Sequence, residues 1–247
     1  MFKIGELVSR NSYKNDIIFR IDKIENNIAY LTGVSVRLCA DSEISDLRKE
    51  TEEGDTFEKR AEFSVGEIRN NNSEYFYIPG KILHIDGDKE YLRKCLAFYK
   101  KANVLAVGVY SKEEDLSKNI SKYLEDVNPD IVVITGHDSS IMNNSKNFSD
   151  AVKICRRYEK DYDKLIIIAG ACQSDYEQLI KSGANFASSP KKINIHALDP
   201  AIIALNLSLS SKNDDINLLD LLSKTSNGKD GIGGVSTKGV MTVGYPR

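Results

Sequence analysis

The sequence predicts an α/β protein whose mostly parallel, doubly wound sheet follows a small antiparallel β-barrel. From Pro79 onward, strand and helix patterns alternate along the chain, which is the order of elements in doubly wound folds. The strand segments, such as 131–134 and 165–168, are continuous apolar runs rather than alternating ones. Strands of that kind are buried on both faces, as in a parallel sheet covered by helices.

Residues 1–40 are predicted to form an SH3-like β-barrel. Short β-prone runs at 17–21, 28–31 and 34–38 are separated by turn-forming residues. These runs lie too close together for the long crossovers that parallel pairing needs, so the strands are expected to be antiparallel. The segment's six basic and four acidic residues are too balanced to indicate nucleic-acid binding by charge.

Residues 41–78 are interpreted as a charged linker or insertion. They contain eleven acidic and five basic residues and few large apolar groups, a composition typical of a solvated segment. Part of it, 44–60, is expected to be helical. The run at 70–73 is expected to be a loop.

Residues 79–247 form the predicted α/β domain. Strands are expected at 81–86, 104–110, 131–135, 165–169 and 185–188, and helices at 89–101, 112–127, 149–158, 176–182 and 200–208. The tail from Asn227 is rich in glycine and is expected to form a loose hairpin or to remain mobile.

The composition excludes several classes of protein. The chain has 247 residues, 41% of them hydrophobic, and a formal charge of −2, values typical of a globular protein. No apolar run reaches the roughly 18 residues of a membrane span, and the first residues do not resemble a signal peptide. Four scattered cysteines indicate reduced thiols in the cytoplasm rather than disulfides. No metal, cofactor, nucleic acid or membrane partner is expected.

The ends of the predicted strands carry the residues that could do chemistry. In open α/β sheets, ligands bind beyond the carboxyl ends of the strands. One strand ends in Gly136-His137-Asp138 and the next in Gly170-Ala171-Cys172. An imidazole beside a thiol favours the nucleophilic thiolate, so Cys172 and His137 are predicted to form a catalytic dyad. The backbone N–H groups of Cys172, Asp138 and Gly136 are candidates to bind an oxyanion.

The other cysteines and histidines lack this setting. Cys95 and Cys155 fall on predicted helix faces, and Cys39 ends a barrel strand with no histidine nearby in sequence. His84 is expected to be packed within a strand. His196, near another possible strand end, is the alternative base.

A strand ending in Gly-His, followed by one ending in Ala-Cys, resembles the caspase-, gingipain- and clostripain-like cysteine peptidases. Those enzymes usually have glycine after the histidine, where this chain has Asp138. The acid that some arginine-specific relatives carry two residues before the cysteine is replaced by Gly170. An arginine pocket would therefore have to be built elsewhere.

A second resemblance covers nearly the whole chain. The opening from Gly5 to Tyr13, the segment from Gly33 to Leu38, the run from Pro79 to Asp88 and the motif Thr135-Gly136-His137-Asp138 resemble the YabG family of sporulation-specific proteases. This resemblance implies a cysteine endopeptidase of the sporulating cell that trims spore coat and cortex-associated proteins after arginine. It also implies an enzyme that acts in the cytoplasm and is associated with the spore coat.

An acid near the strand ends would then pair with the substrate arginine. Asp175, Asp86 and Asp199 are the candidates, although Asp175 also lies where a helix should begin and could cap it.

The chain ends in Gly244-Tyr245-Pro246-Arg247, an end that self-cleavage after arginine would leave. The alternative function is a non-enzymatic module: a receiver-like domain with Asp86 and Asp88 at a Mg²⁺ site, or an adaptor with an inert α/β domain.

Overall fold

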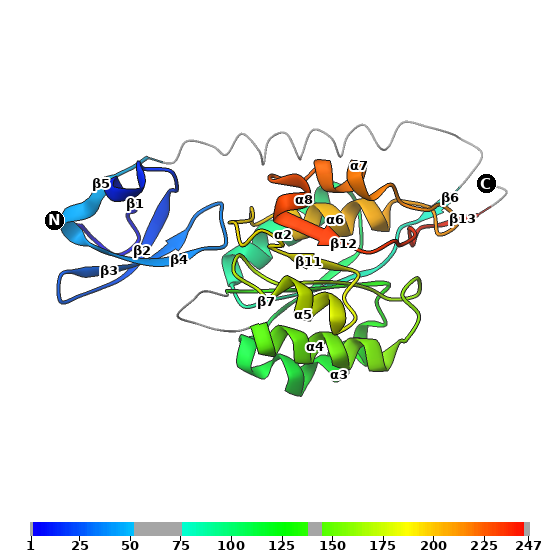
Figure 1. Ribbon diagram of the computed structural model, residues 1–247. Coiled ribbons are helices and arrows are strands. Elements are labelled where there is room, and N and C mark those ends of the chain that lie inside the picture. The colour runs from blue at the N-terminus through cyan, green and yellow to red at the C-terminus, as the bar shows by residue number, and fades with distance from the viewer. Residues whose placement is uncertain (1, 52–75, 138–144, 245–247) are drawn as a thin grey trace.

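A computed structural model describes residues 2–51, 76–137 and 145–244 (Figure 1). An N-terminal antiparallel sheet lies at one end, and a larger α/β unit makes up the rest of the described chain. None of the helices in these ranges is long and apolar enough to cross a membrane.

The N-terminal sheet has five antiparallel strands. They are β1 (Leu7–Arg10), β2 (Phe19–Glu25), β3 (Ile28–Gly33), β4 (Cys39–Glu43) and β5 (Leu47–Lys49), in the order β4-β3-β2-β1-β5. Two 3₁₀ turns, η1 (Asn11–Tyr13) and η2 (Ile44–Asp46), connect them. Side chains that alternate along the strands, among them Val8, Phe19, Ile21 and Leu31, form a small core.

Two expectations for this region are corrected. The sheet is antiparallel as predicted, but it is not closed into a barrel, because β4 and β5 are not paired with each other. The stretch that was expected to begin a helix at Ile44 instead forms η2 and then β5, which pairs with β1. Charge made this stretch look like a solvated helix, whereas the apolar Leu47 packs into the sheet's core. The remainder of the predicted helix and the loop at 70–73 lie outside the described residues.

The larger sheet has the predicted α/β character. Its strands are β7 (Ile82–Asp86), β8 (Ala106–Tyr110), β9 (Ile131–Thr135), β10 (Ile166–Ala169), β11 (Phe186–Ser188) and β12 (Ile232–Gly234), in the order β12-β11-β10-β9-β7-β8. The strands from β7 to β11 are parallel, and β12 pairs antiparallel with β11.

Helices cover both faces of this sheet. Alternate strand residues such as Ile131 and Val133 pack with α2 (Lys89–Lys101), α6 (Asp199–Ser208) and α7 (Leu218–Ser223). The residues between them, such as Val132 and Ile134, pack with α3 (Leu116–Val127), α4 (Ser145–Tyr158) and α5 (Tyr176–Lys181). Because successive strand residues point to opposite faces, strands covered twice must be apolar throughout. The short helices η3 (Glu113–Asp115) and α8 (Gly228–Gly231) complete the described helices.

The glycine-rich tail is more ordered than expected. Its residues form α8, the edge strand β12, and β13 (Thr242–Gly244), which pairs with β6 (Phe76–Ile78) in a separate two-stranded sheet. Glycine suits β12 because a Cβ at Gly234 would lie 2.4 Å from the ring of Phe186. A local composition typical of a loop is thus overridden by pairing with a distant strand.

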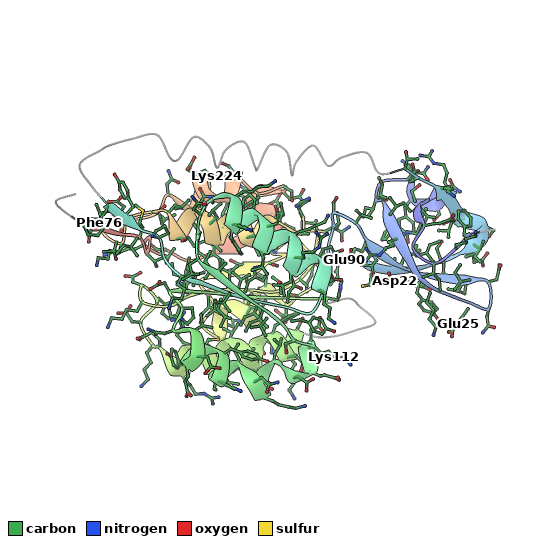
Figure 2. All side chains as sticks on the ribbon, turned by 180° about the vertical axis from the view of Figure 1, so that it is seen from behind. Asp22, Glu25, Phe76, Glu90, Lys112 and Lys224 are labelled. Carbon is green, nitrogen blue, oxygen red and sulfur yellow. The ribbon has the colours of Figure 1, made fainter. Side chains whose placement is uncertain are left out.

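The N-terminal sheet contacts the α/β unit through a short connecting segment. Residues 33–38, here called the bridging segment, run from β3 to β4 and form an antiparallel bridge between Val36 and His196. Beside it, Arg20 of β2 forms an ion pair with Glu90 of α2. Figure 2 shows Glu90 at the end of α2 that faces the N-terminal sheet.

Phe148 offers a test of the packing on the α4 face. Its side chain is fully buried among residues of β9, β10 and α3. Replacing it with alanine is expected to lower the free energy of unfolding by about 3–5 kcal/mol, because it leaves a cavity. Urea unfolding measures this, with Lys146→Ala, an exposed change on the same helix, expected within about 0.5 kcal/mol of wild type. A loss below about 1 kcal/mol for Phe148→Ala would contradict this packing.

Candidate active site

Three neighbouring strands end at the same level of the sheet. Asp86 of β7 is paired with Thr135 of β9, so Asp88 and His137 each lie two residues beyond a matched pair. Ala169 of β10 is paired with Ile134 of β9, so Cys172 and His137 each lie three residues beyond. The sheet register therefore brings a carboxylate, an imidazole and a thiol to one edge, where α/β folds bind their ligands.

His137 is held from two sides. Its Nε2 lies 3.1 Å from Asp88 Oδ2, and its Nδ1 lies 3.3 Å from Cys39 Sγ. Burial alone would lower the pKa of His137, but the hydrogen bonds with Asp88 and Cys39 outweigh it and raise that pKa to about 10. The Asp88 side chain also caps α2, accepting hydrogen bonds from the backbone N–H groups of Glu90 and Tyr91. Asp88 thus ties the imidazole to the rigid start of a helix.

Cys172 is buried next to the backbone of Ile195. Its side chain is fully buried, and its Sγ accepts a hydrogen bond from the Ile195 N–H at 3.4 Å. Burial raises the pKa of the Cys172 thiol to about 12, although the Ile195 N–H opposes this. The strand turns sharply before it at Gly170, whose φ of +116° is rarely adopted by other residues.

The thiol in contact with His137 is that of Cys39. It belongs to the first residue of β4 and is partly exposed. No sequence pattern pairs it with His137, because 98 residues separate the two and they belong to different sheets. Two thiols are therefore candidates to react with the help of His137. Cys39 contacts its ring directly, whereas Cys172 follows the neighbouring strand at the same edge of the sheet.

A buried ion pair lies beside these groups. The guanidinium of Arg37 donates to both carboxylate oxygens of Asp86, at 3.0 and 2.7 Å, and to the carbonyl oxygen of Ala197 at 3.2 Å. It also lies 4.8 Å from the centre of the Tyr91 ring, within range of a cation–π interaction. Both charged side chains are fully buried. Arg37 comes from the bridging segment, whereas the rest of this pocket belongs to the α/β unit.

The Asp86 carboxylate is stabilised in its charged form. Burial would raise its pKa, but the charge of Arg37, with hydrogen bonds from His84 and Arg37, holds the pKa well below its usual range. Thr135 Oγ1 and the backbone N–H of Asp88 also donate to it, each at 2.9 Å. His84 is buried, as expected, and burial lowers its pKa. Of the three predicted acids, Asp86 is the one in contact with a guanidinium among the described residues.

The other two acids have structural partners. Asp175 is the N-cap of α5 and accepts a hydrogen bond from the Gln178 N–H, in agreement with the capping role considered for it. Asp199 is buried and accepts hydrogen bonds from Ser226 and from the backbone N–H of His196. Asp175 is exposed, whereas Asp199 is buried.

The remaining predicted positions have mixed outcomes. His196 is buried, and its Nδ1 accepts from the Leu198 N–H rather than meeting a thiol. Gly136 packs against Glu113, whose Oε1 accepts from the His137 N–H at 2.8 Å. Asp138 and Arg247 lie outside the described residues. Within the described ranges, there is no cluster of three metal-ligating side chains, and the receiver-like acids Asp86 and Asp88 are engaged by Arg37 and His137.

A mostly parallel sheet with thiol, imidazole and carboxylate groups gathered at its carboxyl edge is an arrangement suited to a peptidase. Residues 3–246 match the family model described as YabG peptidase U57. The chain is 39% identical to the "Sporulation-specific protease YabG" of Bacillus subtilis (strain 168), over 99% of this chain and 98% of that protein. The chain therefore belongs to the YabG peptidase U57 family.

Asp88→Asn tests the support of His137. Asparagine still caps α2 but carries no charge, so the pKa of His137 is expected to fall by about one unit or more. NMR titration of the His137 ring measures this, and the exposed Asp150→Asn should leave the midpoint unchanged. An unchanged midpoint in Asp88→Asn would contradict the assigned contact.

The same contact makes a prediction for stability against pH. The folded pKa of His137, about 10, lies above the unfolded value of about 6.5. The stabilisation it supplies should therefore be complete below about pH 6.5 and be lost as pH rises toward 10. Wild type and Asp88→Asn should consequently differ most in unfolding free energy at pH 6 and least at pH 10. A difference that stays constant across this range would exclude the charge of His137 as its source.

Proposed function

We propose that the protein is a cysteine endopeptidase in which Cys172 is the nucleophile and His137 the general acid and base. The observation that carries the proposal is the register of β9 and β10, whose last pair, Ile134 and Ala169, lies three residues before His137 and Cys172 respectively. Asp88 supports it by fixing the imidazole through Nε2, so that Nδ1 is the ring nitrogen on the side of the thiols, in contact with Cys39. The resemblance to caspase- and clostripain-like peptidases favours the same pair and a caspase-like fold.

The reaction would follow the usual course of thiol peptidases. The thiolate of Cys172, paired with the imidazolium of His137, attacks the scissile carbonyl carbon. The backbone N–H groups of Cys172, Gly136 and Asp138 are the candidates to stabilise the oxyanion. His137 then protonates the leaving amine, and water hydrolyses the thioester to regenerate the thiol. Asp88 is a positioning residue that favours the charged imidazolium.

Cys39 is the alternative nucleophile. Its contact with His137 Nδ1 is direct, but it enters from the N-terminal sheet rather than from the sheet edge that carries His137 and Asp88. A nucleophile works best on a rigid element beside its base and oxyanion donors. We favour Cys172, because it lies three residues after β10, at the edge of the same sheet that carries His137 and Asp88.

We further propose that Asp86 selects arginine at the residue before the cleaved bond. A buried carboxylate that already binds a guanidinium through two parallel hydrogen bonds is suited to that planar cation. The tyrosine ring and the Ala197 carbonyl add further recognition. Asp175 and Asp199 are less favoured, because the partners of their carboxylates are a helix N-terminus and Ser226 with the His196 N–H rather than a guanidinium.

The name of the Bacillus subtilis relative indicates the cell stage at which the enzyme would act. The printed name of the Bacillus subtilis protein describes a sporulation-specific protease. We therefore propose that this enzyme acts in the sporulating cell, where spore coat and cortex-associated proteins would be its substrates and partners and the spore coat its place of association.

Single cysteine substitutions separate the two nucleophiles. Cleavage of an added arginine-containing peptide by Cys172→Ala is expected to fall more than about 10³-fold, because the covalent step is lost. Cys39→Ala should retain cleavage. A chromatographic peptide assay measures both, with Cys155→Ala as a control for a buried thiol remote from the site. Loss in Cys39→Ala together with retention in Cys172→Ala would reverse the assignment.

Substrate charge tests the role of Asp86 without altering the fold. Replacing the peptide's arginine with citrulline, which is nearly isosteric but neutral, should lower kcat/KM by about 10²-fold or more, because Asp86 then faces no cation. A lysine peptide should fall between the two, because its ammonium lacks the planar fork. Equal rates for arginine and citrulline would exclude an acidic pocket.

A further inference from the structure

One carboxylate lies across the ends of two neighbouring strands. Glu113 is the first residue of η3, which follows β8, and Figure 2 shows the preceding Lys112 at the end of the α/β unit that faces the N-terminal sheet. Glycines come directly after β7 and β9, at Gly87 and Gly136. A Cβ built at either glycine would overlap the same atom, Glu113 Oε1. The two strand ends therefore leave a space that this carboxylate fills.

Backbone conformation does not explain these two glycines. Neither Gly87 nor Gly136 has a positive φ, whereas Gly170 after β10 does. Residues with a side chain could adopt the same φ, so what glycine supplies at the first two positions is room. A glycine at the end of a strand often marks the close approach of another group, and here that group is the half-buried side chain of Glu113.

The carboxylate of Glu113 holds the backbone of His137. Its Oε1 accepts a hydrogen bond from the His137 N–H at 2.8 Å. The paired residues of β7 and β9 end with Asp86 and Thr135, so His137 lies two residues past the last pair. A hydrogen bond to a charged acceptor is stronger than one between neutral groups. Glu113 thus fixes the chain at the point where strand pairing no longer does.

The turn that carries Glu113 is anchored on both sides. Before it, the Ser111 N–H donates to the carbonyl oxygen of Asp86 at 3.1 Å. After it, Leu116 is fully buried in the core between the sheet and helices α3 and α4. Because both flanking residues are fixed, the carboxylate is a firm support rather than a freely moving side chain.

His137 is consequently held at two points by two different elements. Asp88, at the start of α2, contacts Nε2 of the ring, whereas Glu113 contacts the backbone N–H. Catalytic groups have to be held within about 0.5 Å of their productive geometry, and a misplacement of about 1 Å can lower the rate about 10²-fold. Since Glu113 binds the backbone and not the ring, its effect is on the position of the imidazole.

We infer that Glu113 is a positioning residue for the reaction, and that Gly87 and Gly136 are glycines because its carboxylate passes over them to reach the His137 N–H. This inference rests on the proposed function, in which His137 is the general acid and base. Glu113 fixes the place from which the imidazole serves the thiol and the leaving amine. Its loss should therefore lower kcat and leave KM, because Asp86 and the proposed arginine pocket stay in place.

The competing interpretation is that Glu113 only stabilises the end of the sheet. The experiment measures kcat and KM for an arginine peptide at a temperature at which circular dichroism shows every variant to be folded. Glu113→Ala is expected to lower kcat by about 10²-fold, with KM within about threefold of wild type. Glu113→Gln keeps an oxygen that accepts from the His137 N–H and should restore kcat to within about fivefold of wild type. The exposed Glu114→Ala should match wild type.

A second variant displaces the carboxylate without removing it. Gly87→Ala places a methyl group where Glu113 Oε1 lies, and the end of this flexible side chain is what has to move. We expect kcat to fall by about tenfold or more in the wild-type background but hardly further in Glu113→Ala, because the space is then free. Gly108→Ala is the matched control, since its Cβ also meets the end of a flexible side chain, that of Leu96, and kcat should stay unchanged.

The outcomes separate the two proposals. If wild type cleaves the peptide and folded Glu113→Ala does so with an unchanged kcat, the positioning role is refuted and the proposed function stands. A loss in Glu113→Gln as large as in Glu113→Ala, or a loss from Gly87→Ala that is the same with and without Glu113, refutes the role as well. If wild type does not cleave the peptide, the proposed function fails and the inference with it. Should Glu113→Ala fail to fold, Gly87→Ala still decides, because an unchanged kcat in that variant overturns the inference.

Discussion

The buried ion pair between Arg37 and Asp86 is the interaction on which the arrangement of the site depends. Both side chains are fully buried, and removing one partner of such a pair typically costs about 3–5 kcal/mol, because the other charge is left unpaired. The pair joins the bridging segment to the first strand of the larger sheet. Hydrogen bonds from Tyr91 and Lys94 also hold this segment, but within the described ranges the Arg37–Asp86 pair is its one fully buried ion pair with the α/β unit.

This interaction also explains why the candidate active site is so enclosed. Tyr91, Ile195 and Ala197 bind the bridging segment around Arg37, and Cys172 lies immediately beyond Ile195. The high pKa of the Cys172 thiol follows from its burial.

The sheet itself and the residues at its edge could be predicted from the sequence. Continuous apolar runs such as 131–134 identify strands buried on two faces, and the residues after such strands are the natural candidates for chemistry. Asp88 and His137 form a contact that the register of β7 and β9 explains. Both residues could be singled out from the sequence, but Asp88 was considered only as part of a metal site. Its contact with His137 could not be predicted, because periodicity does not reveal the order of strands in a sheet.

The contacts made by the N-terminal sheet could not be predicted. Arg37 and Cys39 lie in a segment whose pattern indicates only a strand and a turn, and their partners are 49 and 98 residues away. The same limit applies to the glycine-rich tail, whose edge strand is defined by pairing with β11. Local patterns determine elements, whereas docking between sheets depends on complementary shapes and charges that arise only after folding.

The most direct test of the central claim is covalent labelling with a peptidyl arginine chloromethyl ketone. Enzyme that cleaves an arginine peptide is treated with this reagent, and the adduct is located by peptide mass mapping. The account predicts one adduct, on Cys172, with none when citrulline replaces the arginine of the probe. An adduct on Cys39, or equal labelling by both probes, would contradict it.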